Sequence, residues 1–97
     1  MKAYELLYFT APTASAEVRA GIMKRIETTI AAGAGVVDNV DAWGKRKLAY
    51  EIDHLTEGDY TLIDFHDDPA NVAELDRVLR INDAVVRHMI VHRADRD

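Results

Sequence analysis

Two stretches with helical periodicity, each enclosed by strand-like stretches, constrain the fold of this 97-residue chain more than any other feature. In the first, apolar side chains recur every four residues at Val18, Ile22, Ile26 and Ile30. This spacing predicts an amphipathic helix with one buried stripe. Ser15 precedes the helix as a cap residue, because its hydroxyl can accept a bond from a free backbone N–H of the first turn. Gly33 follows the helix and is expected to end it in a left-handed conformation.

The second helical stretch begins at Asp68 and Pro69, an aspartate cap followed by proline at the first helical position. Asp76 and Arg80 lie one turn apart and are expected to pair on its outer surface. Its end is expected at residues 82–83. The apolar positions that form its predicted buried stripe are Val72, Leu75, Val78 and Leu79.

Alternating apolar and polar residues predict four strands. Gly44, inside the second of them, indicates a bulge or bend. Residues 53–58 are expected to form a turn with a mobile tip. Residues 1–93 are expected to form one domain, followed by a short, charged and frayed tail at 94–97. The predicted strands span residues 2–9, 35–52, 59–66 and 84–92.

The order strand, helix, strand, strand, helix, strand predicts a ferredoxin-like βαββαβ fold of the α+β class. Right-handed crossovers bring the first and third strands to the centre of a four-stranded antiparallel sheet with both helices on one face. The other face has no predicted cover. Leu7, Phe9, Tyr60 and Leu62 are expected to point to it by alternation, and an apolar open face of this kind usually needs a partner.

The charge pattern leaves two readings of the basic residues open. The net charge is −5, which by itself argues against nucleic acid, yet a local basic patch can still bind phosphate. Lys45, Arg46 and Lys47 form such a cluster, or they protect a solvated edge strand against aggregation. Arg80 and Arg87 belong to a second basic group, where Arg80 also suits the end of a helix dipole.

The residues that catalysis or metal binding would need are missing or badly placed. There is no cysteine and no glycine-rich phosphate loop. His88 and His92 share a strand face but are separated by about 13 Å at roughly 3.3 Å per residue, too far for one metal ion. We therefore expect no enzyme activity, no metal and no cofactor. The chain has no apolar stretch long enough for a membrane helix and no recognisable signal peptide, so we expect it in the cytoplasm.

Three motifs resemble one family: the opening KAYELLYF, the stretch DAWGKRKLAYEI and the segment LRINDAVVRHMIV. Together they are similar to the sixth protein of the bacterial small ribosomal subunit from about residue 2 to residue 91. The middle motif, WGKRKLAY, is the specific one. The resemblance implies the ferredoxin-like fold and a structural role on the ribosome.

The resemblance also implies two macromolecular partners. These are the central domain of the small-subunit rRNA and the eighteenth protein of the small subunit, which packs against the sheet. Tyr4 and Tyr50 match aromatic positions of the family and are expected to pack in the scaffold rather than to stack on bases. Leu7, Phe9, Tyr60 and Leu62 would form the partner face. The residues that would bind RNA are Lys2, Lys45, Arg46, Lys47, Arg80 and Arg87.

The same open face supports a second hypothesis of a different class. A ferredoxin-like domain with one bare sheet face could instead associate with itself and bind a small metabolite between two sheets. Sequence alone leaves both readings open.

Overall fold

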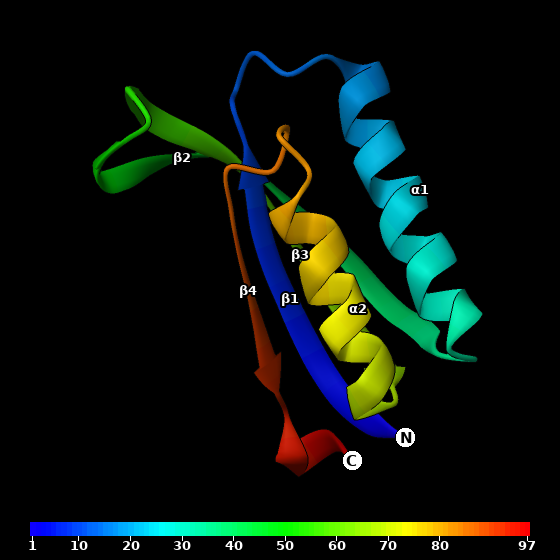
Figure 1. Ribbon diagram of the computed structural model, residues 1–97. Coiled ribbons are helices and arrows are strands. Elements are labelled where there is room, and N and C mark those ends of the chain that lie inside the picture. The colour runs from blue at the N-terminus through cyan, green and yellow to red at the C-terminus, as the bar shows by residue number, and fades with distance from the viewer.

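The computed structural model describes residues 1–97, and every predicted helix and strand is present (Figure 1). A short 3-10 helix at the C-terminus is an additional element. In chain order the elements are β1 (Lys2–Thr10), α1 (Ala16–Ala32), β2 (Val36–Ile52), β3 (Leu55–Asp67), α2 (Pro69–Arg80), β4 (Arg87–His92) and η1 (Ala94–Arg96).

The four strands form one antiparallel sheet in the order β2-β3-β1-β4. Both helices cover the same face of it (Figure 1). The predicted ferredoxin-like fold is therefore confirmed, with β1 and β3 at the centre as the crossovers require. The opposite face carries no helix. Neither helix is long and apolar enough to cross a bilayer.

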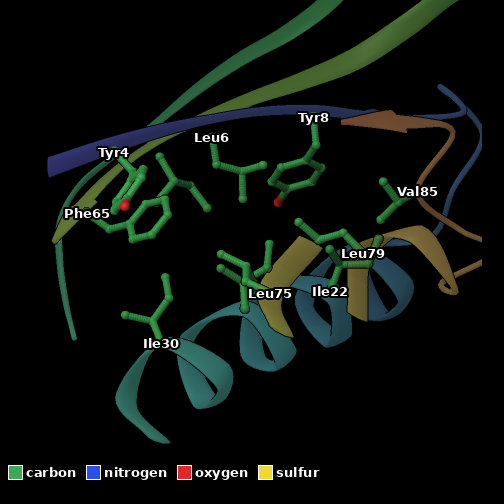
Figure 2. Close-up of a cluster of buried hydrophobic side chains, with 11 residues drawn as sticks. Tyr4, Leu6, Tyr8, Ile22, Ile30, Phe65, Leu75, Leu79 and Val85 are labelled. Carbon is green, nitrogen blue, oxygen red and sulfur yellow. The ribbon is translucent and has the colours of Figure 1, made fainter. Parts of the chain in front are cut away.

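The hydrophobic core fills the space between the sheet and the two helices (Figure 2). Alternation along β1 sends Tyr4, Leu6 and Tyr8 into this core, as predicted, and leaves the intervening residues for the open face. Ile63 and Phe65 of β3 are fully buried on the same side. From the predicted stripes of the helices, Ile22, Ile26, Ile30, Leu75 and Leu79 enter the core. The prediction is wrong for Val18, which is 42% exposed in the first turn of α1.

Helix α1 begins as predicted, because the backbone N–H of Val18 donates to Ser15 Oγ at 3.1 Å. It ends at Ala32 with Gly33 as its C-cap, as predicted. The predicted left-handed conformation at Gly33 is wrong, because Gly33 has a φ of −93° and Ala34 has the positive φ, 60°. Glycine is needed at position 33 for space instead. A Cβ there would lie 2.4 Å from Cγ of Asn71, so the close approach of α2 excludes a side chain.

Helix α2 begins at Pro69 after an extended Asp68, as predicted, but the Asp68 side chain makes no capping hydrogen bond. The fully buried Asp67 instead holds the start of the helix in place. Its Oδ1 accepts from the backbone N–H of Asp68 at 2.8 Å, and its Oδ2 accepts from Nδ2 of Asn71 at 2.6 Å. The helix ends at Arg80, and the predicted Asp76–Arg80 pair is present.

The long β2–β3 hairpin extends well beyond the end of the sheet (Figure 1). Its turn contains only Asp53 and His54, which have φ values of 49° and 64°, rather than the predicted residues 53–58. Positive φ at both central residues is typical of a two-residue hairpin turn whose twist matches that of the two strands it joins. The strands therefore continue almost to the tip.

The C-terminal residues are folded, where a frayed tail was expected. The backbone N–H of Ala3 donates to Asp97 Oδ1 at 2.6 Å, and Asp97 Oδ2 also contacts Nε2 of His92 at 2.8 Å. These contacts hold η1 beside the start of β1. Strand β4 is shorter than predicted, beginning at Arg87 because residues 83–84 form a turn.

Candidate functional site

The open sheet face is organised as three rows that cross all four strands, and the strand register fixes which residues share a row. Each row is written from β2 to β4. The aromatic row, named for its centre, is Gly44, Tyr60, Phe9 and Arg87. The aliphatic row is Asp41, Leu62, Leu7 and Met89. The acidic row is Asn39, Asp64, Glu5 and Val91.

A bulge in β2 adds a third ring to the aromatic row. The register shifts between Ala42 and Gly44, and Gly44 has a φ of 77°, which confirms the predicted irregularity at this glycine. The extra residue, Trp43, stacks on Tyr60 with ring centroids 6.2 Å apart. Tyr60 in turn lies 4.9 Å from the ring of Phe9. Three aromatic side chains thus run side by side toward Arg87.

The aliphatic row is only partly covered. Leu7 and Leu62 are half-buried, and Met89 at the β4 edge is 57% exposed. Tyr60 is also half-buried, whereas Phe9 is almost fully covered. The structure therefore brings all four residues of the predicted partner face together, although Phe9 offers little free surface.

Sequence reasoning missed the exposed apolar residues that adjoin this set, Met89, Val91 and Trp43. The last strand could not be assigned to faces before the buried Val85 and the partly buried Ile90 were located. Given that assignment, alternation along β4 identifies Met89 and Val91 as open-face residues. Trp43 could not be placed by alternation because it lies in the bulge.

The centre of the acidic row is covered by the folded C-terminus. Arg93 NH1 binds Glu5 Oε2 at 2.9 Å, and Arg96 NH1 binds Asp64 Oδ1 at 2.9 Å. Arg96 NH1 also lies 3.6 Å from Glu5 Oε2. Ion pairs of the chain itself thus close the centre of this row, Glu5 and Asp64, whereas Val91 at its β4 end is 38% exposed beside Met89.

His66 lies beside the acidic row and joins β3 to β2 and to the C-terminus. Its Nδ1 is 2.5 Å from Asp38 Oδ2, and its Nε2 is 3.4 Å from the carbonyl oxygen of Arg96. The hydrogen bond to Asp38 raises the pKa of His66, partial burial opposes this, and the Arg96 carbonyl adds to the rise. Protonation of His66 therefore strengthens this connection.

A shallow pocket of about 160 Å³ opens in the face beside Arg87. Leu7, Phe9, Tyr60 and Met89 line it together with Arg87. Pockets that enclose a small molecule usually measure roughly 300–1,000 Å³. The pocket is large enough for one side chain of a partner protein but not for a typical metabolite.

The basic triplet lies where the hairpin leaves the sheet. Lys45 and Lys47 pair in register with Asp59 and Glu57, while Arg46 is opposite Gly58, so the lysines share one side and Arg46 takes the other. All three are exposed and none forms an ion pair within the chain. Their charges are thus free to meet phosphate.

Arg80 forms an ion pair within the chain and Arg87 does not. Arg80 pairs with Asp76, which also binds Nε2 of His88 through its other oxygen at 2.7 Å. The hydrogen bond from His88, and then the one from Arg80, lower the pKa of Asp76. Arg87 makes no ion pair and lies on the open face opposite Phe9.

Lys2 is also exposed and unpaired, but it lies at the opposite end of the sheet from the other predicted RNA-binding residues. Phe9 lies seven residues further along β1, which is about 23 Å at roughly 3.3 Å per residue. The structure therefore groups the triplet and Arg87 at one end of the face and leaves Lys2 apart from them.

Tyr50 departs from the expected packing role. Tyr4 is buried against Phe65 in the core, with ring centroids 5.6 Å apart, as predicted. Tyr50 lies on the projecting hairpin and is 75% exposed. The prediction that Tyr50 forms part of the scaffold is wrong.

The sequence model of one protein family matches nearly the whole chain. The model described as Ribosomal protein S6 matches residues 3–92. The chain belongs to the ribosomal protein S6 family. The expected family and the observed fold therefore agree.

Curated members of the S6 family match over almost their whole length. The small ribosomal subunit protein bS6 of Clostridium kluyveri is 50% identical over 91 residues, covering 94% of this chain and 96% of the relative. The corresponding protein of Desulforamulus reducens is 41% identical over 95 residues, covering 98% of this chain and all of the relative.

Solved structures agree with this assignment. The crystal structure of ribosomal protein S6 from Thermotoga maritima superposes with a TM-score of 0.88 at 35% identity, covering 97% of this chain and 89% of that one. The C-terminal domain of MgtC from Mycobacterium tuberculosis reaches a TM-score of 0.67 at only 9% identity, covering 97% and 89%. That second likeness concerns the fold alone.

Membership of the S6 family makes this chain a component of the small ribosomal subunit, hence ribosome-associated and cytoplasmic. The family is structural rather than enzymatic. The hypothesis of a self-associating, metabolite-binding domain is not favoured by this assignment.

Proposed function

We propose that this chain binds the central domain of the small-subunit rRNA jointly with the eighteenth protein of the small subunit. The partner protein would cover the aromatic and aliphatic rows of the open face. The unpaired cations at the edges of that face would meet the RNA. Binding of each macromolecule would then support binding of the other.

The observation that carries the proposal is the bare aliphatic row, Leu62, Leu7 and Met89, on a sheet whose other face is fully used by the core. An exposed apolar surface beside polar rims is the usual mark of a protein–protein contact. The neighbouring pocket of about 160 Å³ fits an anchoring side chain of the partner.

Charge supports the RNA half of the proposal. Arg87 lies at the β4 end of the aromatic row, and the basic triplet begins next to Gly44 at the β2 end. These cations therefore flank the proposed protein interface on both sides. Because they are unpaired, contact with phosphates would release counterions without breaking ion pairs in the chain.

The net charge of −5 also fits joint binding. An acidic protein attracts RNA weakly by itself, since the sequence-independent part of RNA affinity comes from positive charge. A basic partner seated on the open face would supply the missing positive potential. The proposal therefore predicts weak binding alone and tight binding as a pair.

The test is a titration of a central-domain rRNA fragment with this chain, with the partner protein, and with an equimolar mixture. The proposal expects the mixture to bind the fragment at least about 10-fold more tightly than either protein alone, a typical size for coupled binding. If the mixture binds no more tightly than the better single protein, the proposal fails.

A further inference from the structure

Tyr50 is an aromatic residue that the fold does not use. Its side chain is 75% exposed, makes no aromatic contact in the chain and forms no hydrogen bond through its hydroxyl. Its neighbours Leu48 and Ile52 are half-buried along the hairpin. The ring is therefore available to a ligand, and it stands on a projecting hairpin that also carries the basic triplet.

We propose that Tyr50 stacks on an unpaired base of the RNA that the cationic hairpin meets. This inference rests on the proposed function and names the chemistry of one contact within it. The ligand is a nucleobase turned out of a helix, at a loop, bulge or strand end. Phosphates on either side of that base would be held by the basic triplet.

The backbone keeps Tyr50 away from the sheet. Lys47 pairs with Glu57 and Ile52 pairs with Leu55, so residues 48–51 oppose Thr56 alone. Such a bulge interrupts the pleat and turns side chains out of the sheet pattern. The two-residue turn at Asp53 and His54 closes the hairpin directly after this bulge. Tyr50 therefore lies on a strand of the hairpin and not on a long loop.

The surrounding charges favour an anionic ligand on this segment. Lys45, Arg46 and Lys47 are unpaired and lie three to five residues before Tyr50. One acid of the hairpin is compensated by a cation elsewhere in the chain, since Asp59 binds Arg19 NH1 at 3.1 Å. The remaining acids of the hairpin are spread along it, so the triplet is its one run of adjacent like charges.

An unpaired base fits this arrangement better than a base within a duplex. The major groove of an A-form helix is deep and narrow, so a side chain on a broad hairpin cannot reach the base edges there. An extruded base presents a whole π-face, and an aromatic ring beside cations is the usual means of binding it.

The test measures binding of the central-domain rRNA fragment to this chain, with the partner protein at saturation. Tyr50→Ala is expected to weaken RNA binding by between about 5-fold and 150-fold, the range for loss of one stacked base. Tyr50→Phe keeps the ring and is expected to bind within about 2-fold of the wild type. Tyr50→Leu keeps apolar area without a ring and is expected to behave like Tyr50→Ala.

Three controls distinguish loss of base stacking from loss of apolar surface, of folding or of partner binding. Ile81→Ala removes a similarly exposed apolar side chain from the end of α2 and should leave RNA binding unchanged. Because Tyr50 is exposed, all variants should unfold at the wild-type temperature. Calorimetric titration with the partner protein alone should give the same affinity for Tyr50→Ala as for the wild type.

Each alternative outcome has a distinct meaning. If the wild-type pair binds the RNA and Tyr50→Ala binds it equally well, the stacking inference is overturned while the proposed function stands. If Tyr50→Ala loses affinity for the partner protein itself, Tyr50 is a protein contact and the inference is again overturned. If the wild-type pair does not bind the RNA, the proposed function fails first.

Discussion

Arg87 lies directly opposite Phe9 in the β1–β4 ladder, on the face of the sheet that no helix covers. This pairing sets a free guanidinium at the end of a row of aromatic rings. The aromatic row therefore contains both the apolar centre of the open face and part of its cationic rim. Substitutions at the centre should therefore affect partner binding, and substitutions at the rim should affect RNA binding.

The first prediction concerns the apolar centre. Met89→Gln replaces an exposed apolar side chain of the aliphatic row with a polar one of similar size. We expect affinity for the partner protein to fall about 10-fold or more, because the contact would bury an unpaired amide in place of an apolar group. Calorimetric titration of the two proteins measures this.

The matched control is Ile81→Gln. Ile81 is 61% exposed and Met89 is 57% exposed, but Ile81 lies at the end of α2 on the helical side of the molecule. It should bind the partner as the wild type does. Equal losses from the two variants would show that a glutamine anywhere on the surface weakens partner binding, and would remove the special role of the open face.

The second prediction concerns the cationic rim. Replacing Lys45, Arg46 and Lys47 together with alanine should reduce the slope of log affinity against log salt concentration by about 2 to 3, since each phosphate contact contributes roughly 0.7–0.9. Filter binding of the rRNA fragment at several salt concentrations, with the partner present, gives the slope.

Arg77→Ala is the control for that measurement. Arg77 NH2 binds Glu74 Oε1 at 2.6 Å, so its charge is already compensated within α2. The salt dependence of this variant should equal that of the wild type. An unchanged slope in the triple variant would remove the triplet from the RNA surface.

The third prediction is a pH dependence at His66. Because the folded-state pKa of His66 is raised above 6.5, its contribution to stability is fully present below pH 6.5 and is lost as the pH rises through the folded pKa. Asp38→Asn removes the carboxylate that causes most of the rise. Titration of the imidazole signals by NMR should then show a lower His66 pKa in the variant.

Stability measurements should agree with the titration. The difference in free energy of unfolding between wild type and Asp38→Asn should be largest at pH values below 6.5 and should shrink toward alkaline pH. A difference that grows with pH would contradict the assigned direction of the pKa shift.

The fourth prediction compares two glycines. A Cβ on Gly58 would lie 2.5 Å from Cδ1 of Phe9, so Gly58→Ala must displace that ring and should destabilise the fold by roughly 1–3 kcal/mol. Gly21 is a helical position with nothing within 4 Å of such a Cβ. Gly21→Ala should stabilise by about 0.5–1 kcal/mol. Chemical denaturation measures both, and equal signs would contradict this comparison.

Much of the fold could be predicted from local pattern. The helix stripes and the buried face of β1 are set by periodicity within one element, and the cap by the hydroxyl of Ser15 next to the helix start. The position of the end of α1 was predicted, but the reason for its glycine was not. Gly33 is required because Asn71 of α2 comes close to it, and that contact joins residues far apart in the sequence.

The site was predictable where alternation was undisturbed and not where it was interrupted. Leu7 and Leu62 were assigned correctly to the open face because β1 and the middle of β3 keep a regular pleat. Trp43 and Tyr50 both lie in irregular parts of β2, so their directions depend on bulges that one glycine only partly indicates. The cover of the acidic row depends on tertiary ion pairs of Arg93 and Arg96, which no local pattern reveals.

Methyl NMR of this chain during titration with the partner protein would show directly whether that protein binds to the open sheet face. We expect large shifts of the methyl signals of Leu7, Leu62 and Met89, with Val18 and Ile81 on the helical side unchanged. Shifts confined to Val18 and Ile81, with the three open-face residues unmoved, would contradict the proposed interface.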